Sequence, residues 1–311
     1  MTASVAAAVP VERLGAVTGL FREIGDLKRV RTPDITGSWA QAAFTRAWTA
    51  LVAGEEPGYV ADIECAAALA GARLAAVDAP MLLQCGLSAE QVETVLRRAV
   101  DEVDAGLHSV TVARVRVALV QTAVTPVEPA PLPAFVSRLA SQPRAGATAP
   151  GRPRIVVEPP ENHAEHCWAV AVYGALLAED VGADRGEVFL LGLAHHLHNA
   201  VLPDAGFAGD TLIGEYLGPL VRRLTEEQLA ELPEALAART SAVLAHRDGA
   251  DTPTGRAFHA ADVLDRVLQV HHHARAAAFT AEQALVDLQL VHASPVSAYH
   301  EAVLDAAGLA P

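Results

Sequence analysis

The chain has 311 residues, of which 51% are hydrophobic and only 19% are charged, so it can bury a sizeable core and is long enough for two domains. Its formal charge of −14 creates a negative field that repels nucleic acid and anionic membrane surfaces, and we expect neither as a partner. Aromatic residues are scarce and alanine-rich stretches recur, which favours an all-α fold because alanine is the best helix former.

Cysteine usage and the amino-terminal residues indicate the compartment. Cys65, Cys85 and Cys167 are far apart and form no C-x-x-C motif, which is typical of the reducing cytosol. The first ten residues carry no cationic stretch and do not resemble a signal peptide. The most apolar long stretch, Cys65–Leu87, is interrupted by charged residues and is a poor membrane span. We expect a cytoplasmic protein.

Residues 9–120 predict a run of helices, which we assign to an N-terminal helical domain covering residues 1–123. Ser88 and Gln91 form a capping-box signature, and the apolar residues that follow repeat at intervals of three and four. Val110–Val120 is ambiguous, because its alternating valines fit a strand while its alanines and arginines fit a helix. No motif assigns this domain a role. Its helices could form a lid or the face of a homodimer.

A proline-rich segment at residues 124–153 predicts a semi-rigid linker with one short helix at Ala134–Ser141. Helices resume in a second domain, residues 154–311, where Asn162 is the expected N-cap of the first helix. The expected helices of this domain are Glu161–Glu179, Arg185–His198, Glu215–Leu224, Glu226–Leu232, Pro233–His246, Arg256–Ala277, Ala281–Leu290 and Val296–Ala307.

Histidines are concentrated in this second domain, since all thirteen except His108 lie after residue 160. Imidazole and carboxylate are the usual ligands of transition metals, and several helices that each offer one or two of them inward are a common way to build a metal site. Two adjacent buried histidines are costly without partners, which a metal would supply. The candidates on the expected helices are His163, His166, His195, His196, His198 and Asp262.

Three motifs in order resemble the HD superfamily of metal-dependent phosphohydrolases, which places a His on one helix, a His-Asp pair at the end of the next, and an Asp on a later helix. The matching segments are Glu165–Ala171, Leu191–Leu197 and Phe258–Asp265. The resemblance covers roughly residues 155–280 and implies an HD-domain-like helical bundle. It implies that the metal ligands are His166, His195, His196 and Asp262, with Asp265 as the alternative to Asp262.

One residue departs from this pattern, because His196 stands where the family has its second metal-binding Asp. An imidazole cannot bridge two metals through two oxygens, so the exchange favours one divalent ion (Fe, Mn, Co, Ni or Zn) over two. His198 and His246 are the spare ligands that a second ion would use. The position four residues after His195 also departs, since Asn199 replaces the usual catalytic Lys or Glu.

The resemblance implies hydrolysis of a phosphoester of a nucleotide or another small phosphorylated metabolite, in which the metal lowers the pKa of a bound water. His163, Glu161 and Asp204 are the candidates for proton transfer. The expected partner is a small anionic metabolite. Two alternatives stay open: an HD-type iron-dependent oxygenase, and a non-catalytic ligand-binding or regulatory protein, which the exchanges at His196 and Asn199 would suit.

Overall fold

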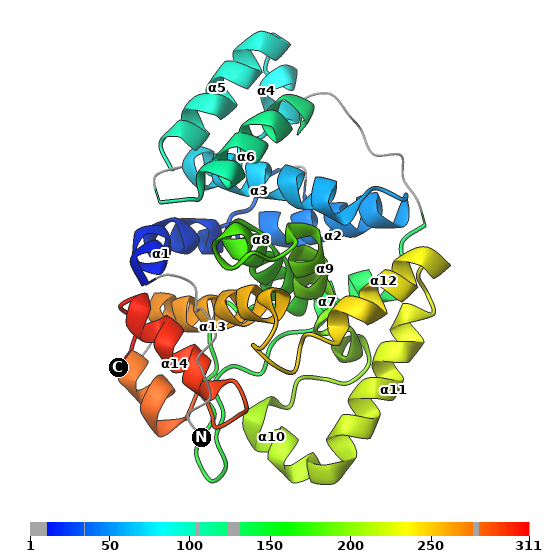
Figure 1. The fold of residues 1–311 in the computed structure, drawn as a ribbon, viewed down its shortest axis with the longest axis vertical. Helices are drawn as coiled ribbons and strands as arrows, with labels where there is room; N and C mark the ends of the chain where they lie inside the picture. Colours follow the sequence, from blue (N-terminus) through cyan, green and yellow to red (C-terminus); the bar gives the residue numbers. More distant parts are fainter. Residues whose placement is uncertain (1–10, 34, 104–105, 123–130, 276–279, 311) are drawn as a thin grey trace.

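The computed structural model describes residues 11–33, 35–103, 106–122, 131–275 and 280–310, and within them the chain is all-α, without a strand (Figure 1). The helices are α1 Val11–Asp26, α2 Trp39–Val52, α3 Pro57–Leu74, α4 Ala79–Gln84, α5 Ala89–Asp101, α6 Ser109–Thr122, α7 Ala134–Ser141, α8 His163–Val181, α9 Arg185–Ala194, α10 Gly206–Ile213, α11 Leu217–Leu229, α12 Glu234–Leu244, α13 Pro253–Ala274 and α14 Ser297–Ala306, with 3₁₀ turns at η1 Leu197–Ala200 and η2 Gly214–Tyr216 and a π turn at Gln283–Asp287.

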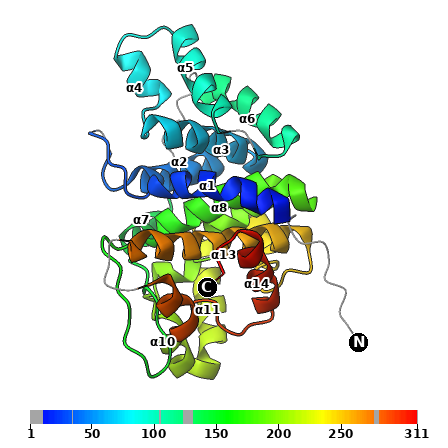
Figure 2. The ribbon, with the colours of Figure 1, turned by 90° about the vertical axis from the view of Figure 1, so that its left-hand side faces the viewer.

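The helices are stacked in layers, with α4, α5 and α6 at one end and α10, α11 and α14 at the other (Figures 1 and 2). Helix α8 lies at the centre and packs on α9, α13, α2 and α3. Every residue of α8 from His163 to Ala178 is buried, as expected for a helix that is apolar on nearly all sides. The histidines of this helix, His163 and His166, therefore lie in the interior.

A close hairpin of α8 and α9 brings distant histidines together. Asn162 caps the start of α8 in a capping box with Glu165, and Gly182 ends the helix in the left-handed conformation, so the chain reverses directly into α9. Gly192 lets the two helices touch, since a Cβ there would lie 2.5 Å from the Cα of Ala171. The end of α9 is therefore held beside the first turns of α8.

Several expected elements are confirmed. The capping box at Ser88 and the N-cap at Asn162 are present, α7 has the expected bounds, and the ambiguous segment Val110–Val120 belongs to the helix α6. Other boundaries were wrong. The helix expected to continue to His198 ends at Ala194 because the chain tightens into η1, and the expected helix Ala281–Leu290 is a π turn at its centre.

Two further differences lie between residues 206 and 232. Helix α10 was not expected from the sequence. The expected helices Glu215–Leu224 and Glu226–Leu232 form the single helix α11, because no glycine or proline separates them. These differences lie away from the central helices.

One hydrophobic core joins the two expected domains. Phe21 stacks on Tyr173 with ring centroids 4.3 Å apart, and Trp39 meets Trp168 edge to face at 5.4 Å. The short helix of the expected linker also belongs to this core, where Phe135 is fully buried. The division at residues 123 and 124 itself falls outside the described residues. The division proposed from the sequence thus does not separate two cores.

No helix among the described residues combines the length and apolar character that crossing a membrane requires.

Replacing Phe135 with alanine tests whether α7 is part of the core. The ring is fully buried and lies 5.0 Å from the ring of Trp48, so Phe135→Ala should lower the free energy of unfolding by about 3–5 kcal/mol. Val156→Ala, at a side chain that is 62% exposed in the same proline-rich region, should change it by less than about 0.5 kcal/mol. Denaturant unfolding followed by tryptophan fluorescence measures both. Equal effects would mean that α7 is a spacer.

Candidate metal centre

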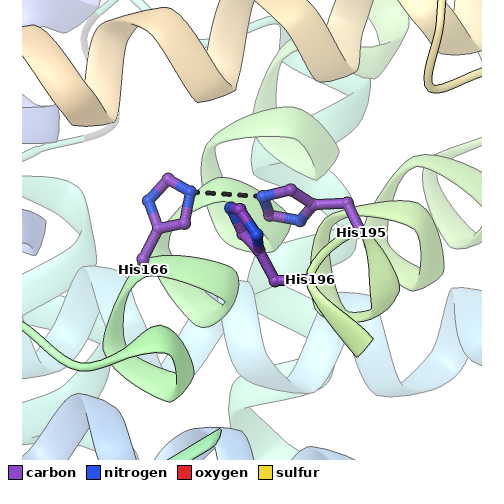
Figure 3. A group of neighbouring side chains, drawn as sticks. All are labelled: His166, His195 and His196. Atoms are coloured by element: carbon purple, nitrogen blue, oxygen red, sulfur yellow. Dashed lines mark hydrogen bonds between the residues drawn. The ribbon is translucent and has the colours of Figure 1, made fainter. Parts of the chain in front are cut away.

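Three histidines from the α8–α9 hairpin point toward one another (Figure 3). His166 lies in the first turn of α8, and His195 and His196 directly follow the last residue of α9. Each ring offers one nitrogen, and these nitrogens lie within 4.8 Å of one another. His166 Nε2 and His195 Nε2 are 3.2 Å apart. This arrangement could hold a metal ion, and it brings together three of the four ligands expected from the sequence.

Each of the three rings has an acceptor at its other nitrogen. The Nδ1 atoms all lie 2.7 Å from an oxygen: His166 from Asp265 Oδ2, His195 from the Gly192 carbonyl, and His196 from Asn199 Oδ1. The amide orientation of Asn199 is consistent, because its Nδ2 donates to the Leu202 carbonyl. Since these partners accept, the ring protons belong on Nδ1, and each Nε2 keeps its lone pair free for a ligand bond.

The free nitrogens fit one metal ion. Burial and the neighbouring charged groups lower the pKa of His195 and His196 well below their usual range, so both rings are neutral. Two lone pairs that face each other at 3.2 Å repel unless a proton or a metal ion lies between them. Two nitrogens bound about 2.1 Å from one ion, at angles of roughly 90–110°, lie about 3.0–3.4 Å apart. The observed separation matches this spacing.

Helix α13 places two aspartates on opposite sides of the His166 ring. Asp262 Oδ1 lies 3.3 Å from His166 Nε2, on the side of the free nitrogens, whereas Asp265 contacts Nδ1. Burial alone would raise the pKa of Asp262, but Arg266, 3.3 Å away, and His166 hold it well below its usual range. The geometry therefore favours Asp262 over Asp265 as the carboxylate that could join the three histidines.

Asp265 instead connects His166 to the only lysine of the chain. Lys28 Nζ contacts Asp265 Oδ1 and lies 2.6 Å from Glu161 Oε1. Burial alone would lower the pKa of Lys28, but the two carboxylates raise it above its usual range. A second group with metal-ligand spacing, Glu161, His166 and Asp265, thus already contains an ammonium ion. Glu161, one of the candidates for proton transfer, faces this lysine and not the free nitrogens.

His163 lies beside the histidine cluster without a hydrogen bond. Its ring centroid is 4.7 Å from that of His196, its side chain is fully buried, and neither ring nitrogen has a partner among the described residues. Burial, assisted by the positive charge of Arg144, lowers the pKa of His163 to about 3. The nearest carboxylate is Asp204, whose Oδ2 lies 3.9 Å from His163 Nε2.

Asp204 and Arg144 complete this side of the site. Asp204 accepts the backbone N–H groups of Ala145 and Gly206. Burial alone would raise its pKa, but Arg144 and these donors lower it. The Nε of Arg144 lies 3.8 Å from Glu161, while its Nη1 is buried and has no partner among the described residues. The guanidinium thus has a free donor at an interior position.

The two spare histidines lie outside the cluster. The ring of His198 is 5.8 Å from that of His196, and burial, with Arg247 nearby, lowers its pKa to about 4. His246 Nδ1 lies 3.2 Å from the hydroxyl of Thr252. Among the described residues, no group with metal-ligand spacing includes either of them.

Comparison with known families decides the classification. The family model for the HD domain matches residues 136–299, which is more than half of the chain. The chain belongs to the HD domain family. No curated protein and no solved structure matches it.

Within this HD domain the match begins in α7, earlier than the resemblance at residue 155 indicated. It therefore includes Arg144, which the sequence interpretation had left in the linker. HD domains form a superfamily of the metal-dependent phosphohydrolase type, in agreement with a histidine cluster that could hold a divalent ion. Lys28 lies outside the match.

Sequence reasoning missed both Arg144 and Lys28. Arg144 is held beside the start of α8 by backbone pairing of its N–H with the Glu161 carbonyl, at 2.8 Å. Lys28 reaches its carboxylates across 133 and 237 positions of sequence. That it is the only lysine, in a chain with 37 acidic residues, was the one available signal.

The two aspartates of α13 should differ in their effect on metal affinity. Asp262→Ala removes a group that faces the free nitrogens, so Co²⁺ affinity should fall by more than about 100-fold, whereas Asp265→Asn should cost about 10–100-fold, as the loss of an outer partner does. Isothermal titration measures both. Asp248→Asn, at a highly exposed side chain, should have no effect. A larger loss for Asp265→Asn would reverse the assignment.

Proposed function

We propose that this protein is a metal-dependent hydrolase that removes phosphate from a nucleotide or another small phosphorylated metabolite. His166, His195, His196 and Asp262 would hold one divalent transition metal ion. The observation that carries the proposal is a set of unpartnered polar atoms beside these residues: Arg144 Nη1, His163 Nδ1 and His163 Nε2.

Buried donors without partners are costly, and this cost is recovered when a ligand supplies the acceptor. A guanidinium is well suited to phosphoryl oxygens, to which it donates short, charge-assisted hydrogen bonds. The overall charge of −14 repels anions, so an anionic substrate needs a local positive field. Arg144 and a divalent ion would provide it. These features support a small anionic metabolite as the substrate.

The residues around the histidine cluster would have separate tasks. A divalent ion supplies Lewis acidity, which makes a water a stronger nucleophile and polarises a phosphoryl oxygen. Arg144 Nη1 donates to the phosphoryl group and balances its charge. His163 donates its ring N–H to the same group. Asp204, ionised and 3.9 Å from His163, would accept a proton released at the site.

The positions of the spare histidines favour one ion over two. A two-iron oxygenase would need further ligands, and neither His198 nor His246 belongs to the histidine cluster. A non-catalytic protein would bind the same anion without turnover. The test of phosphate release therefore also distinguishes an enzyme from a binding protein.

Phosphate release is the direct test. Full-length protein loaded with Mn²⁺, Co²⁺, Ni²⁺, Mg²⁺ or Fe²⁺ should release inorganic phosphate from at least one member of a panel of nucleotides and sugar phosphates. Chelator should abolish the release, and His166→Ala should lose it together with the bound metal. A metal-loaded protein that binds panel members but releases no phosphate would show a binding role and contradict the proposal.

Arg144→Met tests the phosphate contact. Because a buried hydrogen bond to a charged group contributes about 1.5–3 kcal/mol, KM should rise by about 10–100-fold while metal content stays unchanged. Arg152→Met is the matched control, since that arginine is exposed in the same segment, and it should keep the KM of the unsubstituted protein. An unchanged KM in Arg144→Met would remove this residue from the site.

A further inference from the structure

Lys28 is a buried cation that the proposed chemistry does not use. It follows α1, in the part of the chain that the HD family model does not match. Its side chain is 3% exposed, and its ammonium contacts Asp265 and Glu161, which are also buried. The backbone around it is fixed, because Leu27 is buried and its carbonyl accepts from Ala40 N–H in α2.

We infer that Lys28 is a positioning residue of the metal centre, and that the N-terminal segment thereby forms part of the site. Lys28 holds one oxygen of Asp265, and the other oxygen of Asp265 holds His166 at Nδ1, 2.7 Å away. The inference rests on the proposed metal centre but not on hydrolysis.

Lys28 acts on His166 through Asp265, whose carboxylate is buried. Its carboxylate is 1% exposed, and an ionised carboxylate in such a place needs an opposite charge and hydrogen bonds. Lys28 supplies the charge and holds one oxygen of Asp265 in place, so that the other oxygen accepts from His166 Nδ1. Outer partners of this kind fix the orientation of a metal-binding imidazole and raise its basicity. Without Lys28, the same carboxylate would have to move, take a proton or recruit water, and His166 would lose its fixed orientation.

A second reading is that the ion pair only stabilises the fold. The chain offers a comparison for this reading in Arg46, which pairs with the buried Glu64 through two hydrogen bonds of 2.9 Å. Glu64 also accepts from Trp168 Nε1 but contacts none of the proposed metal ligands. Loss of the Arg46 pair therefore reports stability alone, whereas loss of the Lys28 pair should also report on the metal.

The single lysine allows a measurement on the unsubstituted protein. Full-length protein labelled with ¹⁵Nζ-lysine has one side-chain ammonium resonance from the chain, that of Lys28. Adding Zn²⁺ should shift this resonance, and the shift should disappear in Asp265→Asn. If calorimetry shows that Zn²⁺ binds but the Lys28 resonance does not change, the inference is wrong. If Zn²⁺ does not bind at all, the proposed metal centre fails first, and the inference falls with it.

Variants measure how much Lys28 contributes to metal affinity. Lys28→Met should lower Co²⁺ affinity by about 10–100-fold and alter the visible spectrum of the bound Co²⁺, and Lys28→Arg should recover part of both. Arg46→Met should lower the unfolding temperature but keep the Co²⁺ affinity within about threefold and leave the spectrum unchanged. A folded Lys28→Met protein with the original affinity and spectrum would overturn the inference. If Lys28→Met does not fold, the ammonium resonance of the unsubstituted protein decides the question.

Discussion

The site depends on one constraint, which is that buried imidazole rings need partners at both of their nitrogens. At Nδ1 each of the three rings has a partner, because a carboxylate, a carbonyl and an amide oxygen accept the Nδ1 protons of His166, His195 and His196. On the other side the lone pairs converge, and His166 and His195 bring theirs within 3.2 Å. A metal ion could satisfy such a group, and the acceptors at Nδ1 orient the three rings so that together they could hold one.

Small residues and helix caps hold the three histidines in this arrangement. Gly192 allows α9 to lie against Ala171, and the capped start of α8 fixes the turn that carries His166. Because α9 ends at Ala194, His195 and His196 leave the helix, and their rings approach from the turn rather than from one helical face. A continuous helix to His198 would have turned adjacent rings about 100° apart and separated them.

The charges near the site explain how an acidic protein could accept an anion. Negative groups are present at the centre, but Asp265 and Glu161 share Lys28, and Asp262 faces Arg266. Arg144 has a buried donor without a partner among the described residues. The acidic groups at the centre are thus paired with cations, and a bound divalent ion would make the local field there more positive than the field of the whole chain.

The sequence by itself determined the helical class, the capping boxes, the order of the histidine motifs and hence the family. These features depend on residues within a few positions of one another, where helical periodicity and capping chemistry act. It left Asp262 and Asp265 as alternatives, because both lie on the same helix three residues apart. Only the tertiary structure decided that Asp262 faces the free nitrogens and Asp265 the opposite side of the ring. The roles of Lys28 and Arg144 also needed the fold, because only packing brings these cations beside carboxylates that no local pattern connects to them.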